Sequence, residues 1–89
     1  MTMTTTLLTE LNDERRNVRL RAALELASRP EPNVTQALIE RLSEETDGFV
    51  LEDLTWAIVQ HGETAVSGVL ALLTSDDSVS RRQAAHVLS

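Results

Sequence analysis

Few side chains in this sequence are placed for catalysis or metal binding. The histidines, His61 and His86, have no His, Cys or carboxylate three or four residues further on, the helical spacing at which two ligands can share a metal ion. Glu52 and Asp53 are adjacent, so on a helix they point about 100° apart and do not form a general acid–base pair. No phosphate-binding glycine loop or nucleophile motif occurs. We therefore predict no catalytic residue, no metal and no cofactor, and expect a protein that is not an enzyme.

Most of the charged residues are expected to form an ordinary solvated surface. Residues 1–29 carry five arginines that could bind phosphate or an acidic groove, but four acids alternate with them, so a solvated surface is favoured. Glu52 and Asp53 likewise indicate a solvated acidic face. His61 is expected to cap the last turn of its helix, where the helix dipole favours it. The arginines are Arg15, Arg16, Arg19, Arg21 and Arg29.

Composition indicates one small all-α domain. The chain has 89 residues, of which 42% are hydrophobic, with only three Gly and two Pro to make turns. No apolar run approaches the roughly 20 residues of a membrane span. A net charge of −6 disfavours nucleic acid and acidic membranes as partners. The absence of cysteine is typical of a reducing compartment, and a cytoplasmic location is expected.

An internal repeat with a period of 31 residues organises the chain. An apolar triplet at i, i+1 and i+4, which forms one helical stripe, occurs three times without insertion. A polar turn and a second apolar pattern follow each triplet in the same register. The triplets are Leu7, Leu8 and Leu11, then Leu38, Ile39 and Leu42, then Val69, Leu70 and Leu73.

Each repeat is predicted to be a helical hairpin. We expect a flexible leader over residues 1–6 and one domain over 7–89, with repeats at about 7–29, 33–62 and 64–89. The second helices are expected over 17–28, 48–61 and 79–89. Pro30 and Pro32 are expected to end a helix, Asn33 and Gln36 to cap the next one, and Gly62 to end the middle second helix.

The second helices resemble those of HEAT-like repeats. Val18-Arg19-Leu20-Arg21-Ala22-Ala23-Leu24-Glu25-Leu26 has the arginine and paired alanines of the short kind also found in phycobilisome lyases. Residues 80–88 match with Ser80 in place of Val. Residues 49–57 depart, because they lack both features, and they are similar to small bacterial HEAT-repeat domain proteins. The resemblance implies an α-solenoid, a right-handed superhelix of about three hairpins.

The resemblance also implies contacts between repeats. In such proteins an arginine just inside the second helix meets a turn aspartate of a neighbouring unit. Arg19 and Arg81 are the arginines in question here. Their expected partners are Asp13, Asp47, Asp76 and Asp77.

One side of the second helices is left for a partner. On a helical wheel, polar residues of the first repeat gather within about 100°, and a step of 31 residues places Trp56 on the same ridge. A large aromatic residue there is a candidate binding hot spot. The alternative is that Trp56 packs on Phe49 or on a neighbouring helix. The partner-binding candidates are Arg21, Glu25, Glu52, Trp56 and Gln60.

The predicted function is a protein–protein interaction scaffold. The alternatives are a nucleic-acid-binding HEAT-like module, or an accessory subunit related to bilin-lyase-type repeat proteins. The last helix has no Gly, Pro or polar cap after His86. Either the natural chain continues beyond Ser89, or this terminal face pairs with another copy to give a homo-oligomer through the C-terminal helix.

Overall fold

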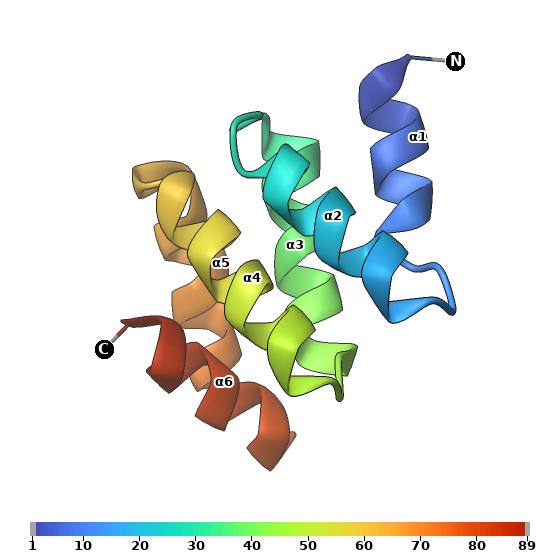
Figure 1. Ribbon diagram of the computed structural model, residues 1–89. Helices are drawn as coiled ribbons and strands as arrows, with labels where there is room; N and C mark the ends of the chain where they lie inside the picture. Colours follow the sequence, from blue (N-terminus) through green and yellow to red (C-terminus); the bar gives the residue numbers. More distant parts are fainter. Residues whose placement is uncertain (1, 89) are drawn as a thin grey trace.

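Three antiparallel helical hairpins follow one another along the chain (Figure 1). The structure is a computed structural model that describes residues 2–88. Met1 of the expected leader and Ser89 of the expected third repeat lie outside the described residues. The hairpins are formed by α1 (Met3–Glu10) with α2 (Arg16–Leu26), α3 (Pro32–Glu44) with α4 (Gly48–Gln60), and α5 (Glu63–Leu73) with α6 (Ser78–Leu88).

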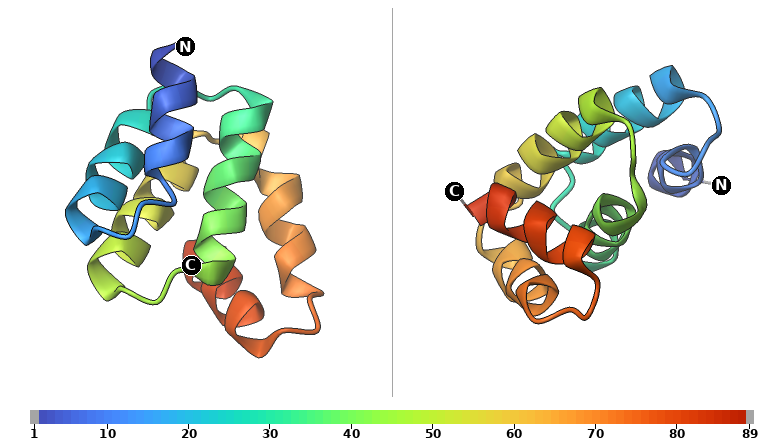
Figure 2. Two further views of the ribbon diagram at one scale, coloured as in Figure 1. Left: turned by 90° about the vertical axis from the view of Figure 1, so that its right-hand side faces the viewer. Right: turned by 90° about the horizontal axis from the view of Figure 1, so that it is seen from below.

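The hairpins stack side by side into a short solenoid. The first helices α1, α3 and α5 form one layer, and the second helices α2, α4 and α6 form the other (Figure 2). Helix α2 packs along α4, α3 packs along α5, and α6 contacts both α3 and α4. Within residues 2–88 all regular structure is helical, which confirms the predicted all-α solenoid. None of these helices is long and apolar enough to cross a membrane.

The predicted apolar stripes form the core between the layers. Leu7, Leu38 and Val69, the first members of the three triplets, are all buried. Ala22 and Ala23 are fully buried, so their small side chains lie where the helices approach most closely. Helices α3 and α5 also approach closely, because a methyl group added at Gly68 would lie 2.6 Å from Ile39 Cδ1.

Two predicted helix starts need correction. Helix α1 begins at Met3, so residues 3–6 of the expected flexible leader are helical, because the Thr2 side chain accepts a hydrogen bond from the Thr5 N–H and caps the first turn. Pro32 begins α3 instead of ending the preceding helix, since proline is favoured in the first turn. Glu31 is the N-cap of α3, so the expected capping pair of Asn33 and Gln36 is wrong.

Aspartates in the turns cap the second helices of the middle and third hairpins. Asp47 Oδ1 accepts hydrogen bonds from the N–H groups of Phe49 and Val50 at the start of α4. Asp77 Oδ2 accepts from the Ser80 hydroxyl at 2.8 Å at the start of α6. Gly62 directly follows the C-cap of α4 and has a φ of 59°, the left-handed conformation that glycine adopts without strain.

A buried ion pair joins the first two hairpins. Glu45 lies in the turn between α3 and α4, and its side chain is only 1% exposed. Arg19 of α2 donates from Nε to Glu45 Oε1 at 2.9 Å and from Nη2 to Oε2 at 3.1 Å. The Asp47 N–H donates to Oε2 at 3.0 Å, and Arg41 Nε lies 3.4 Å from Oε1. Three hydrogen bonds and two positive charges therefore compensate one buried carboxylate.

The same site reaches all three hairpins. Arg19 Nη1 donates to the carbonyl oxygens of Asp13 at 2.8 Å and Glu14 at 2.9 Å, which ties α2 to its own turn. Gln83 of α6 donates from Nε2 to the Glu45 carbonyl oxygen at 3.4 Å. Glu45 is thus the residue at which the three units meet.

Arg19 contacts the turn of the neighbouring hairpin as expected, but its partner there is a glutamate instead of an aspartate. Arg19 takes the carboxylate of Glu45 and only the backbone carbonyl of Asp13. Asp47 is paired with Arg16 at 3.4 Å, and its carboxylate already caps α4. Arg81 donates to the Ser75 carbonyl oxygen at 2.6 Å and forms no ion pair with Asp76 or Asp77 within the described residues. Asp47 thus caps α4 and still reaches Arg16 of the preceding hairpin, whereas the buried position beside Arg19 is taken by Glu45.

His61 forms a second polar connection at the other end of α2 and α4. It occupies the expected C-cap position of α4, but its side chain is 4% exposed and buried between helices. Nε2 donates to the Leu26 carbonyl oxygen at 2.9 Å, because a carbonyl can only accept. Nδ1 lies 2.6 Å from the Thr35 hydroxyl. His61 therefore joins the C-terminal end of α2 to α3 and α4.

We expect Glu45→Ala to lower the free energy of unfolding by about 3–5 kcal/mol, because Arg19 would keep a buried charge without its partner. This is a large part of the total for a domain of this size, which is about 5–10 kcal/mol. Urea denaturation followed by circular dichroism measures the change. Glu44→Ala is the matched control. Glu44 is exposed and forms a long ion pair of 3.8 Å with Arg41, so this variant should lower the free energy of unfolding by no more than about 0.5 kcal/mol. Equal losses for the two variants would contradict the assignment.

Acid should weaken this site. Burial raises the pKa of the Glu45 carboxyl, but the hydrogen bonds from Arg19 and the Asp47 N–H, together with the charges of Arg19 and Arg41, outweigh burial and leave the pKa below its ordinary value. The stabilisation is therefore complete above the pKa of the unfolded state and is lost as the pH falls through the pKa of the folded state. The difference in unfolding free energy between wild type and Glu45→Gln should shrink from about pH 6 to about pH 3. A difference that stays constant over this range would rule this out.

Thr35→Val should cost about 1–3 kcal/mol of stability, because it keeps the shape of the side chain but leaves His61 Nδ1 without a partner. Thr35→Ser keeps the hydroxyl and is expected to cost clearly less than Thr35→Val. Thermal or urea unfolding of the two variants side by side provides the comparison. If the serine variant were the less stable one, packing rather than the hydrogen bond would be the dominant contribution of Thr35.

Candidate interaction surface

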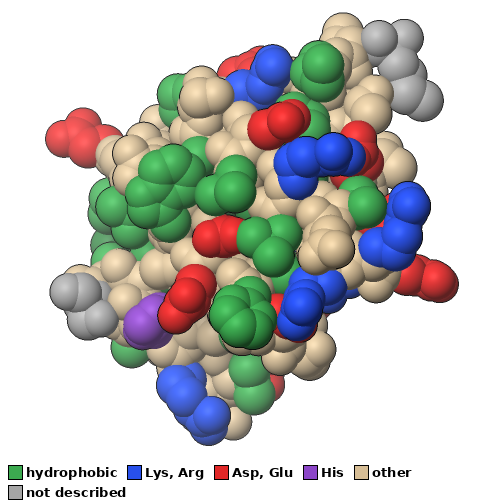
Figure 3. Space-filling view, viewed as in Figure 1, with side chains coloured by type: hydrophobic (Ala, Val, Ile, Leu, Met, Phe, Trp, Pro, Cys, Tyr) green, Lys and Arg blue, Asp and Glu red, His purple; other side chains and the backbone are tan. Residues whose placement is uncertain are grey.

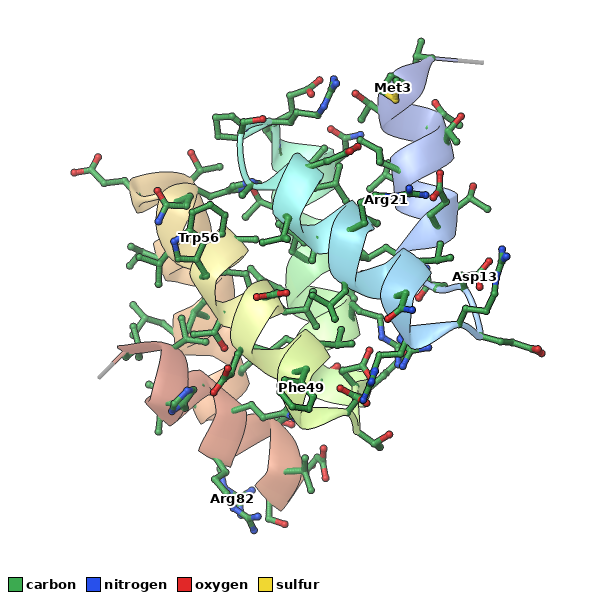
Figure 4. All side chains as sticks on the ribbon, viewed as in Figure 1. Met3, Asp13, Arg21, Phe49, Trp56 and Arg82 are labelled. Carbon is green, nitrogen blue, oxygen red and sulfur yellow. The ribbon has the colours of Figure 1, made fainter. Side chains whose placement is uncertain are left out.

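The outward sides of α2 and α4 form one continuous face. The two helices pack along each other, and both lie toward the viewer in Figure 4, where Arg21, Phe49 and Trp56 are labelled on this side. All five residues predicted to bind a partner are exposed and lie on these two helices. We call this surface the α2/α4 face. Its exposed members are Arg21, Leu24, Glu25, Ser28, Phe49, Glu52, Trp56, Val59 and Gln60.

Trp56 is half exposed on this face, with 49% of its surface accessible. It borders a shallow hollow of about 360 Å³ together with Leu24 of α2, Ala27 at the C-cap of α2, and Gln60 of α4. Trp56 thus borders this hollow with residues of the neighbouring helix and presents half of its surface outward. In the space-filling view, hydrophobic atoms gather on the left at the place where Trp56 lies in the matching stick view (Figures 3 and 4).

Phe49 is a second exposed aromatic residue that sequence reasoning missed as a surface residue. It is 65% exposed, so it is not the packing partner of Trp56 that was considered. The Arg16 guanidinium lies 5.3 Å from its ring centroid, within the range of a cation–π interaction. Phe49 and Trp56 are seven residues apart, which places them on the same side of α4 about 10 Å apart along its axis. This spacing was the signal in the sequence that could have identified Phe49.

A more apolar hollow lies between α4 and α6. It has a volume of about 300 Å³ and is lined by buried Leu42, half-buried Leu51 and, at its edge, exposed Glu52, Arg82 and His86. A negative and a positive side chain therefore border an apolar depression. This hollow was not predicted, because Arg82 and His86 are thirty or more residues from Glu52 in the sequence.

Negative charge is concentrated near the middle of the face. Glu52 is exposed beside the half-buried Asp53. Burial, and then the charge of Glu52, raise the pKa of the Asp53 carboxyl, so a nearby cation would stabilise the Asp53 carboxylate. Arg21 does not supply it, because its Nη2 lies 3.6 Å from Glu10 Oε2 of α1. Glu25 and Gln60 are exposed at the edges of the face.

No metal centre is found among residues 2–88, since no group of three or more His, Cys, Asp and Glu residues is close enough to hold an ion. His61 is committed to the contacts that hold α2, α3 and α4 together. What the arrangement offers is a surface with aromatic and apolar groups, two hollows and a polar surround, which are the features of a protein-binding site.

Comparisons with known proteins agree with the architecture. The family model for HEAT repeats matches residues 4–89, which is nearly the whole chain. Neither a search of curated proteins nor a search of solved structures found a match. HEAT repeats are commonly protein-interaction scaffolds and are generally non-enzymatic. With three stacked helical hairpins and a family match over this length, the chain belongs to the HEAT repeat family.

Proposed function

We propose that this protein is a non-enzymatic scaffold that binds a partner protein through the α2/α4 face. The observation that carries the proposal is the pair of exposed aromatic residues, Phe49 and Trp56, on one side of α4 with a hollow on each flank of that helix. Solvent-exposed aromatic residues contribute more to binding per residue than other types, because they bury a large rigid surface on association.

The surroundings of the two rings favour a partner segment with apolar and basic residues. The hollow between α4 and α6 accepts an apolar side chain over Leu42 and Leu51. The Glu52 and Asp53 carboxylates beside it attract Lys or Arg, and pairing would remove their mutual repulsion. The same carboxylates oppose a phosphate backbone, so a protein partner is favoured over nucleic acid.

The face is already shaped for binding. Arg19 with Glu45 connects α2 and α4 at one end, and His61 with the Leu26 carbonyl connects them at the other. A surface whose supporting helices are fixed loses little conformational entropy on association. The partner therefore meets the two rings at a constant separation.

Trp56→Ala should weaken partner binding about tenfold or more, because the ring is the largest apolar group on the face. Glu52→Arg should weaken it as well, by repelling a basic segment. The measurement is affinity purification with wild type and each variant, with captured proteins quantified by mass spectrometry. Circular dichroism checks that the helices remain folded.

Glu40→Arg provides a matched charge reversal away from this face, since Glu40 is exposed on α3 in the other layer. Proteins captured by wild type and Glu40→Arg but lost with both face variants would support the proposal. Capture of the same proteins by all four would refute it. Trp56 is the single tryptophan of the chain, so its fluorescence emission should also shift to shorter wavelength when a captured partner is added.

A further inference from the structure

The third hairpin exposes apolar residues at positions that are buried in the middle hairpin. In the middle unit, Ile39 is 4% exposed and Ala57 is fully buried, because the third hairpin packs on them. One period later, Leu70 and Leu88 are each 48% exposed. The same change separates Thr35 from Val66 and Leu54 from Ala85. We call Val66, Leu70, Ala85 and Leu88 the tail face.

The opposite end of the solenoid shows the complementary pattern. Val34 and Ala65, which lie in the first turns of α3 and α5, are 0% and 3% exposed because a hairpin precedes them. Met3 occupies the same position in the first unit and is 60% exposed. Met3 lies on α1 at the far end of the molecule from α5 and α6 (Figures 1 and 4). We call the exposed side of α1 with its following turn the head face.

Arg81 repeats the geometry of Arg19 on the tail face, without a carboxylate. Arg81 is two periods after Arg19. Arg19 Nη1 donates to the carbonyl of Asp13, six residues earlier, and Arg81 Nη1 donates in the same way to that of Ser75, also six residues earlier. Arg19 then uses Nε and Nη2 to bind Glu45 of the next hairpin. Among the described residues no carboxylate lies within ion-pair distance of Arg81.

Glu14 is the matching acid on the head face. It is one period before Glu45, in the turn between the first and second helices of its unit. Helix α1 ends at Glu10 whereas α3 continues to Glu44, so Glu14 lies in a longer turn and is exposed. Its carboxylate has no cation within ion-pair distance in residues 2–88. The two halves of the pair that joins the first two hairpins thus recur unpaired, one at each end.

We propose that copies of this chain stack head to tail, with the tail face of one copy on the head face of the next and Arg81 bound to Glu14 across the junction. The junction would continue the stacking already seen between hairpins, with Met3 against the apolar tail residues. A contact between two different faces gives rings or open filaments rather than a closed dimer. The tail and head faces are the two ends of the solenoid, and the tail face meets the α2/α4 face where Val59 borders Val66 and Leu88. Self-association through these ends goes beyond the proposed function.

Charge reversal at Arg81 and Glu14 tests the proposal in the full chain. Wild type should assemble as its concentration rises in sedimentation velocity runs. Arg81→Glu and Glu14→Arg should each weaken self-association about tenfold or more, since each brings like charges together at the junction. A mixture of the two variants should assemble again, because the tail face of the first, now acidic, meets the head face of the second, now basic. The double variant should also recover assembly.

Arg82→Glu is the matched control, since it makes the same charge change one residue away at the edge of the α4–α6 hollow and should leave assembly intact. A second pair of variants tests the apolar contact of the junction. Leu70→Asp and Met3→Asp should each reduce assembly, and because both side chains are exposed, neither change should unfold the chain. Three results would overturn the proposal. They are a wild type that stays monomeric at millimolar concentration, loss of assembly with only one of the two charge variants, and no recovery in the mixture.

Discussion

The buried pair of Arg19 and Glu45 fixes how the first two hairpins stack. Apolar stripes alone specify that two helices pack, but similar side chains along each stripe leave their relative position weakly determined. A guanidinium and a carboxylate that are both removed from water allow one position only, because a shift by one turn would leave two buried charges unpaired. The charge of Arg41 and the hydrogen bond from the Asp47 N–H make the carboxylate tolerable at that depth.

This constraint has a counterpart at the other end of the same helices. Helices α2 and α4 are joined near their N-terminal ends by Arg16 with Asp47 and by Arg19 with Glu45, and near their C-terminal ends by His61 with Leu26. Fully buried apolar residues fill the space between these connections. Fixing both ends prevents the two helices from sliding or opening like a hinge. The face that carries Phe49 and Trp56 is therefore positioned by polar contacts on its inner side.

The sequence predicts those features that depend on a repeated pattern or on neighbouring residues. The 31-residue spacing predicted the hairpins, whereas it left open whether Trp56 is exposed or packed, and the structure has it half exposed. Glu45 could not be singled out, because it follows another glutamate in a polar turn and only the stacking decides which of the two is buried. His61 was predicted as a cap from its place beside Gly62. Its role in joining helices could not be predicted, because its side-chain partners lie 26 and 35 residues away in the sequence.

The departure of the middle unit from the repeat pattern links the two proposals. Val50 stands where the other units have Arg19 and Arg81, so the junction between the second and third hairpins has no arginine at this position. Among residues 2–88, arginine–carboxylate ion pairs between hairpins occur only at the first junction, and Arg81 and Glu14 stand unpaired at the two ends. Stacking of copies through Arg81 and Glu14 would repeat the α2/α4 face along one side of the assembly. A partner with several basic and apolar segments would then bind more tightly than one segment alone, because each further contact forms at a high effective concentration. Modest affinity at a single face is sufficient under that arrangement.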